Sequence, residues 1–188
     1  MHAFVDESER PGRYLMCAVL VAPAALTTVR RSLIDLRMPG QHRLHLHNER
    51  DPRRRLILDR IAGLPVRANV YAQPGRAGRA RIGCLRRLTA DLLDAQVSRL
   101  TIEPVDGWIP RDRRAILDEL RAQDRRGRLA YDHVVPKLEP ILWAADAVAW
   151  AYGAGGDWRR RIEAILEIRP GQRETRAPAV RRQPGFTS

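Results

Sequence analysis

The sequence predicts an α/β domain with a mixed sheet of about five strands flanked by helices. Short apolar runs bounded by turn residues alternate with longer segments of helical spacing, which is the pattern of strands and flanking helices. The first two apolar runs are separated only by a turn and favour an antiparallel hairpin, whereas helices separate the later runs. Together these observations indicate a sheet of mixed direction.

The hairpin comes first. Residues 3–6 form a short apolar run ending at Asp6, and Glu9-Arg10-Pro11-Gly12 is typical of a turn. Tyr14–Ala22 is apolar throughout, as in a strand buried on both faces. Further on, His45 and His47 alternate with leucines, which predicts a strand over Arg43–His47. The other elements expected in this half are helices over 24–36 and 51–61 and a strand over 66–72.

The second half alternates in the same way. Strands are expected over 100–105 and 128–134, and helices over 79–97, 111–123, 139–152 and 157–168. Four arginines crowd the first half of the 79–97 helix, where a solvated face is the expected arrangement; they are Arg79, Arg81, Arg86 and Arg87. We therefore predict one domain over 1–168. Pro, Gly and Arg without periodicity over 169–188 predict a disordered basic tail.

Composition limits the classes of protein that fit. The 188 residues contain 34 Lys+Arg against 22 Asp+Glu, a formal net charge of +12. A basic surface of this kind favours a nucleic-acid partner, although arginine-rich usage can also reflect genome base composition. Two cysteines favour a reduced, cytoplasmic protein. No apolar run reaches the roughly 18 residues of a membrane span, and the N-terminus lacks a signal-peptide layout.

Asp146 is the most informative single residue. Its same-face neighbours on the expected helix are apolar, and no basic residue lies within one turn. An unpaired carboxylate against a packed core is costly, so we expect a compensating group, and a bound cation is an economical one. The alternatives are an Asp on a solvated stripe, or one that accepts a hydrogen bond from a distant backbone N–H.

Other acidic residues are weaker candidates on their own. Asp6, followed by Glu7 and Ser8, ends the first strand, which would hold a metal ligand rigidly. Glu49 follows His45 and His47 at intervals of two, so one strand face could present a His-His-Glu zinc site. Alternatively, the histidines line a groove and Glu49 starts a helix. Asp106 follows the 100–105 strand, although Asp-Gly is also an ordinary turn pair.

Three segments together resemble a known family. They are Phe4-Val5-Asp6-Glu7-Ser8, His45-Leu46-His47-Asn48-Glu49, and the alanine-rich helix from Glu139 to Trp150. Over residues 3–152 the chain resembles the bacterial family catalogued as "domain of unknown function 3800", in its short Arg-rich actinobacterial form. The resemblance implies an RNase H-like fold and, residue by residue, metal ligands at Asp6, Glu49 and Asp146. Asp106 falls where RNase H-like enzymes often have another acid. One departure is Glu9, where the family usually has Gly.

Carboxylates from separate elements, if brought together, suit Mg²⁺ or Mn²⁺. We therefore predict a metal-dependent nuclease-like hydrolase acting on DNA or RNA, with Asp6, Glu49 and Asp146 as ligands and Asp106 or Glu7 assisting. One alternative is a nucleic-acid-binding or regulatory protein with a degenerate site on the same scaffold. Another is a small-molecule hydrolase that uses His45 and His47.

Overall fold

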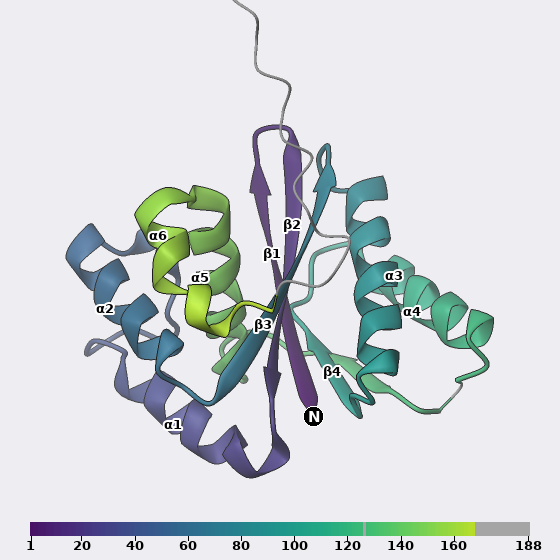
Figure 1. Ribbon diagram of the computed structural model, residues 1–188, viewed down its shortest axis with the longest axis horizontal. Helices are drawn as coiled ribbons and strands as arrows, with labels where there is room; N and C mark the ends of the chain where they lie inside the picture. The colour runs from purple at the N-terminus through teal and green to yellow at the C-terminus, as the bar shows by residue number, and fades with distance from the viewer. Residues whose placement is uncertain (126, 168–188) are drawn as a thin grey trace, which may run out of the picture.

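The computed structural model describes residues 1–125 and 127–167. These residues form three layers, a central sheet with helices on each of its two faces (Figure 1). The sheet has five strands within these residues, in the spatial order β3-β2-β1-β4-β5. β1 pairs antiparallel with β2, and β2 with β3, whereas β4 is parallel to β1 and β5 to β4. The predicted mixed sheet is thus confirmed. The strands are β1 (His2–Arg10), β2 (Arg13–Val21), β3 (Val66–Pro74), β4 (Arg99–Ile102) and β5 (Ala130–His133).

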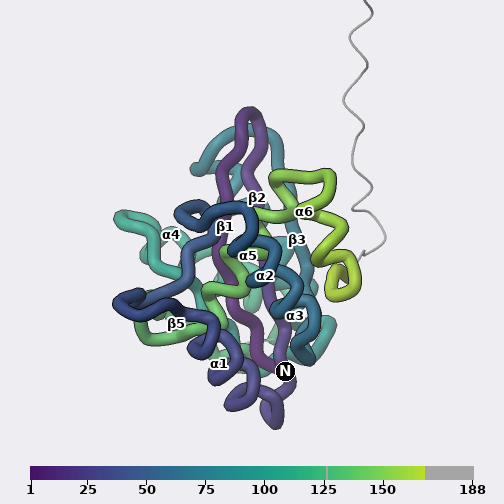
Figure 2. The backbone as a smooth tube through the Cα atoms, turned by 90° about the vertical axis from the view of Figure 1, so that its left-hand side faces the viewer, coloured from purple at the N-terminus to yellow at the C-terminus, as the bar shows by residue number. Residues whose placement is uncertain are grey.

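Helices cover both faces of the sheet. One layer contains α1 (Leu26–Asp35), α2 (Asp51–Ala62), α5 (Ile141–Ala154) and α6 (Gly156–Arg161), and Figure 2 shows it in front of the strands. The opposite layer contains α3 (Arg79–Asp94) and α4 (Ile109–Ala122). Short 3₁₀ turns occur at η1 (Pro23–Ala25), η2 (Leu46–Asn48) and η3 (Glu163–Ile165). Within the described residues, no helix has the length and apolarity needed to cross a membrane.

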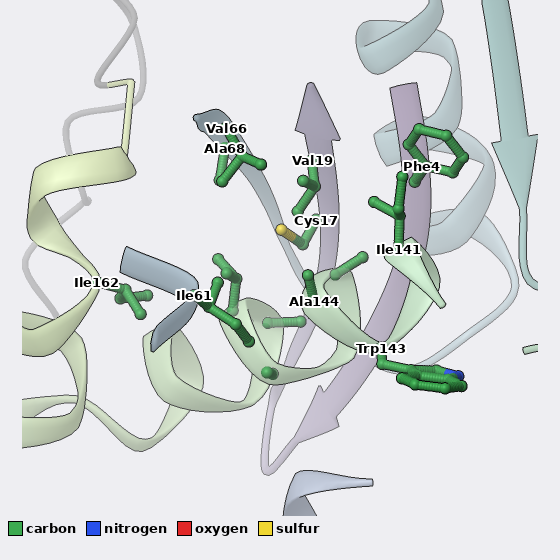
Figure 3. Packing of buried hydrophobic residues seen from close by; sticks show 14 of the residues in the cluster. Phe4, Cys17, Val19, Ile61, Val66, Ala68, Ile141, Trp143, Ala144 and Ile162 are labelled. Carbon is green, nitrogen blue, oxygen red and sulfur yellow. The ribbon is translucent and has the colours of Figure 1, made fainter. Parts of the chain in front are cut away.

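Strand alternation divides the apolar side chains between two cores. Phe4 and Cys17 point toward α5, and Figure 3 shows this cluster closing around Ala144. Val5 and Met16, their neighbours in sequence, point toward α3 and α4 instead. The alanines of α5 let the helix approach the sheet closely, and the helix is apolar almost all round because the sheet and the other helices of its layer enclose it.

The hairpin forms as the apolar runs predict, but its strands are longer than expected. β1 continues through Glu9 to Arg10, so that only Pro11 and Gly12 remain in the turn. Gly12 adopts a φ of 70°, a left-handed conformation that glycine tolerates without strain. Because β1 extends beyond Asp6, the acidic side chains lie along a paired strand rather than at its free end.

The strand predicted over Arg43–His47 is wrong. This segment runs across α5 and ends in the short turn η2. Its backbone groups bond to side chains instead of a neighbouring strand: Leu46 N–H donates to Asp146, and Arg54 donates to the carbonyls of Leu46 and His47. The alternation of leucines and histidines therefore reflects Leu44 and Leu46 anchoring the segment in the core.

The expected solvated face of α3 also needs a correction. Arg79, Arg86 and Arg87 are exposed, but Arg81 is fully buried. Sequence spacing could not identify it, because its buried partner Asp112 lies on another helix. The tail predicted over 169–188 lies outside the described residues, and its prediction stays a prediction.

Candidate functional site

An acidic cleft lies where β1 and β4 run side by side, on the face of the sheet that α5 covers. The parallel pairing continues past β4, since Glu103 N–H donates to the Val5 carbonyl at 3.0 Å. This pairing brings the carboxylates that follow Val5 and Ile102 to the same cavity, which has a volume of about 180 Å³. Its ionisable lining residues are Asp6, Glu7, Arg43, His45, Glu103 and Asp146.

Asp6 is the most deeply placed carboxylate of this cleft. Its residue is 8% exposed, and its Oδ1 accepts a hydrogen bond from the Glu7 backbone N–H at 2.7 Å. Burial raises the pKa of Asp6 well above its usual range, and the negative charges of Glu103, Asp146 and Glu7 raise it further. The cleft thus concentrates more negative charge than its own side chains neutralise.

Asp146 does not face the core unpaired, which corrects the expectation from its helix neighbours. It points into the cleft, where its Oδ2 accepts a hydrogen bond from Leu46 N–H at 3.0 Å and lies 3.2 Å from Nδ1 of His45. The hydrogen bond to Asp146 raises the pKa of His45, although burial acts in the opposite direction. Both partners lie at the start of η2, about a hundred residues before Asp146 in the sequence.

Glu103 is a residue of the cleft that the sequence reasoning missed. It is the first residue after β4, and its Oε1 pairs with Nη1 of Arg43 at 3.2 Å. Asp106, the acid selected after this strand, is exposed and does not line the cavity. The wrong acid was chosen because the end of the strand was placed too late. β4 ends at Ile102, three residues before the predicted end at Val105, so the first acid after the strand is Glu103.

Glu49 also lies outside the cleft. It is buried, accepts a hydrogen bond from Nε2 of Gln41 at 2.9 Å and lies 4.0 Å from Nε of Arg53. The rings of His45 and His47 are 6.1 Å apart, but Glu49 does not join them. Among residues 1–125 and 127–167, no three His, Cys, Asp or Glu side chains are grouped to hold a metal ion, which includes the His-His-Glu arrangement.

Glu7 leads from the cleft into a buried charge network on the opposite face of the sheet. Its carboxylate lies 2.8 Å from Nη1 of Arg81, which also donates to the Tyr14 hydroxyl. The same guanidinium donates two hydrogen bonds to Asp112, at 2.9 and 2.7 Å. His133 completes the network at 3.2 Å from Asp112. Burial raises the pKa of Glu7, and Arg81 opposes that rise.

The donor set of the cleft suits a hard divalent cation. Asp6, Glu103 and Asp146 offer carboxylate oxygens, the ligands that Mg²⁺ and Mn²⁺ prefer. Burial, together with the charges of Glu103 and Asp146, raises the pKa of Asp6, and a cation among these carboxylates would relieve their repulsion. The three side chains would still have to close in around the ion, since they are not grouped at ligand distances.

The order and direction of the strands, with helices on both faces of the sheet, are those of an RNase H-like fold. The chain is similar to RNase HII in the structure of its complex with PCNA from Archaeoglobus fulgidus, with a TM-score of 0.52 and 16% identity over 87% of this chain and 74% of that one. The predicted RNase H-like sheet flanked by helices is therefore confirmed. No family model and no curated protein matches the sequence.

Proposed function

We propose that this protein is a metal-dependent nuclease-like hydrolase that cleaves phosphodiester bonds of DNA or RNA. The observation that carries the proposal is the convergence of Asp6, Glu103 and Asp146 on one cavity in an RNase H-like fold. The resemblance to the family of domains of unknown function 3800 supports Asp6 and Asp146 as ligands. Glu103 takes the place that the sequence reasoning assigned to Glu49 and Asp106.

Mg²⁺ or Mn²⁺ bound to these carboxylates would supply a nucleophilic water and stabilise the leaving oxygen. The residues of the chain would do the remaining work. Asp6 accepts a hydrogen bond from the Glu7 backbone N–H and Asp146 accepts one from Leu46 N–H, and these bonds orient both carboxylates within the cleft. Arg43, half exposed beside Glu103, can hold a phosphate oxygen of the substrate at the mouth of the cleft.

His45 is the candidate proton donor of this site. Its Nδ1 is held by Asp146, and its Nε2 has no hydrogen-bond partner among the described residues. The hydrogen bond to Asp146 raises the pKa of His45, which favours the protonated ring relative to a free histidine. A protonated Nε2 can transfer its proton to the leaving oxygen as the phosphodiester bond breaks.

A cleavage assay tests the proposal. End-labelled single- and double-stranded DNA and RNA are incubated with the full chain in Mg²⁺, Mn²⁺ or EDTA. We expect cleavage only with a divalent ion, and loss of at least a hundredfold in Asp6→Asn, Glu103→Gln and Asp146→Asn. The matched controls Glu49→Gln and Asp106→Asn test the residues predicted from sequence, and both should retain activity. Activity abolished in these controls but kept in Glu103→Gln would refute the assignment of Glu103.

A second candidate function is a nucleic-acid-binding or regulatory protein with a degenerate cleft. The observation that favours it is the absence, among the described residues, of three acidic or histidine side chains grouped at ligand distances. Mn²⁺ distinguishes the two functions independently of cleavage. Mn²⁺ should raise the melting temperature of the nuclease, and this rise should disappear in Asp146→Asn, because only binding to the native state stabilises it. A degenerate cleft predicts no rise in either protein.

A further inference from the structure

A second hollow lies beyond the acidic cleft, between the first half of α3 and the start of α4. Its volume is about 520 Å³, within the range of small-ligand sites. Ile82 and Trp108 make the floor of this hollow apolar. Gly78 and Gly83, which have no side chains, let a ligand come close to the backbone there. Three arginines surround this floor: Arg79, Arg86 and Arg111. We call this site the arginine hollow.

The charge of the arginine hollow is only partly compensated. Arg86 lies 3.6 Å from Asp118, but no carboxylate among the described residues lies within 4.0 Å of Arg79 or Arg111. Arg79 and Arg111 are exposed, so their guanidinium groups are available to a ligand. Guanidinium groups around an apolar floor match the chemistry of phosphate next to a planar ring.

Trp108 supplies the planar surface. It is half-buried and directly precedes α4, whose Asp112 N–H donates to the Trp108 carbonyl at 2.9 Å. The guanidinium of Arg111 stacks 4.9 Å from the Trp108 ring centroid. Stacking on an aromatic ring beside an arginine is how proteins hold unpaired bases without reading their sequence.

The arginine hollow and the acidic cleft are neighbours. The buried guanidinium of Arg81 lies 2.8 Å from the Glu7 carboxylate, which lines the cleft, and 5.9 Å from the Trp108 ring centroid. The two sites are thus linked through the interior by the Arg81 side chain, since the cleft lies on the face of the sheet that α5 covers and the arginine hollow lies between α3 and α4 on the opposite face.

We infer that the arginine hollow binds an unpaired nucleotide of a nucleic-acid strand, with its base on Trp108 and its phosphates on Arg79 and Arg111. The inference deepens the proposed function and takes its substrate class from it. A paired base cannot stack on Trp108 without leaving its partner, so the hollow selects single-stranded over duplex substrates. Stacking and phosphate contacts are common to DNA and RNA, and the hollow accepts both.

Binding in EDTA tests the inference without cleavage. The probes are a fluorescein-labelled oligothymidylate and the matching oligouridylate, with a duplex of the same length as competitor. We expect Trp108→Ala to weaken binding of both single strands about tenfold. Arg79→Gln with Arg111→Gln should weaken it and reduce the salt slope by about 0.7 for each phosphate that these arginines neutralise in the wild type. The matched control removes two exposed arginines of α4 outside the hollow, Arg113→Gln with Arg114→Gln, and should bind as the wild type.

Tryptophan fluorescence provides a second readout. The variant Trp108→Phe keeps an aromatic ring at this position but removes its tryptophan fluorescence, so a difference from wild type reports on residue 108. Oligothymidylate should quench the wild type more than Trp108→Phe, because the remaining tryptophans lie outside the hollow. Equal binding by wild type and hollow variants would overturn the inference, as would quenching by an acidic peptide but not by the oligonucleotide. A protein that binds through the hollow but cleaves nothing would refute the proposed function and leave this inference standing.

Discussion

At the scale of single residues, Arg81 is the charge on which the packing beneath α3 depends. It is fully buried and bonded to Asp112, which is fully buried too. Arg81→Met keeps the bulk of the side chain but leaves Asp112 without its main partner, and we expect a loss of about 3–5 kcal/mol in the free energy of unfolding. Arg87→Met, at an exposed position of the same helix, should change it by less than about 0.5 kcal/mol. Urea denaturation measures both, and equal effects would contradict the role of the buried network.

The contact between His45 and Asp146 makes a second prediction at this scale. The hydrogen bond to Asp146 raises the pKa of His45 in the folded protein. The stability it contributes is fully present below the unfolded pKa of about 6.5 and is lost as the pH rises through the higher folded pKa. In EDTA, Asp146→Asn should therefore lower the pKa of His45 measured by NMR, and the stability gap to wild type should be larger in mild acid than in mild base. Asp118→Asn, an acid on α4, should leave the pKa of His45 unchanged.

The candidate site was predictable from sequence only in part. Asp6 stood out because it ends an apolar strand, and Asp146 because it lies within an apolar helix. Both residues line the cleft. Glu103 was missed because its position depends on where parallel pairing with β1 ends, which local sequence does not record. The partners of Asp146 were missed for a similar reason, since His45 and Leu46 reach it through an irregular segment without periodicity.

At the scale of elements, α5 is the helix whose packing holds the cleft together. Ala144, near the start of α5, is fully buried against the β1–β2 hairpin (Figure 3). Ala144→Leu adds volume where neither helix nor sheet can yield, so we expect a loss of about 1–3 kcal/mol in the free energy of unfolding. Ala154→Leu, at the exposed last residue of the same helix, is the control and should cost less than about 0.5 kcal/mol. A tolerated Ala144→Leu would show that α5 packs loosely.

Elements with long apolar runs were predicted correctly, and irregular ones were not. The hairpin and α5 bury nearly every residue of their central segments, and such patterns are independent of distant partners. The 43–47 segment alternates like a strand, but its backbone is satisfied by Asp146 and Arg54. The tertiary fold decides whether the backbone of an alternating segment forms hydrogen bonds with a neighbouring strand or with side chains.

At the scale of the whole molecule, a strongly basic chain contains an acidic cleft. The net charge of +12 favours a nucleic-acid partner, whereas the carboxylates of the cleft would repel phosphate unless a cation were bound among them. Under the proposed function, exposed arginines such as Arg79 and Arg111 would hold the phosphate backbone, and the buried acids would determine where it is cleaved.

The charge distribution along the chain makes the last prediction. Residues 169–188 contain five arginines and one glutamate, a net charge of +4. If those arginines neutralise phosphates, deleting 169–188 should weaken single-strand binding and reduce the salt slope by about 0.7 for each phosphate, or at most about 3.5. A full-length chain with the five arginines replaced by glutamine is the matched control, and it should reproduce the deletion because only the charge differs from wild type. Thermal melts check that domain 1–168 remains intact in both proteins. An unchanged slope would mean that nucleic acid is held by the arginines of the folded domain alone.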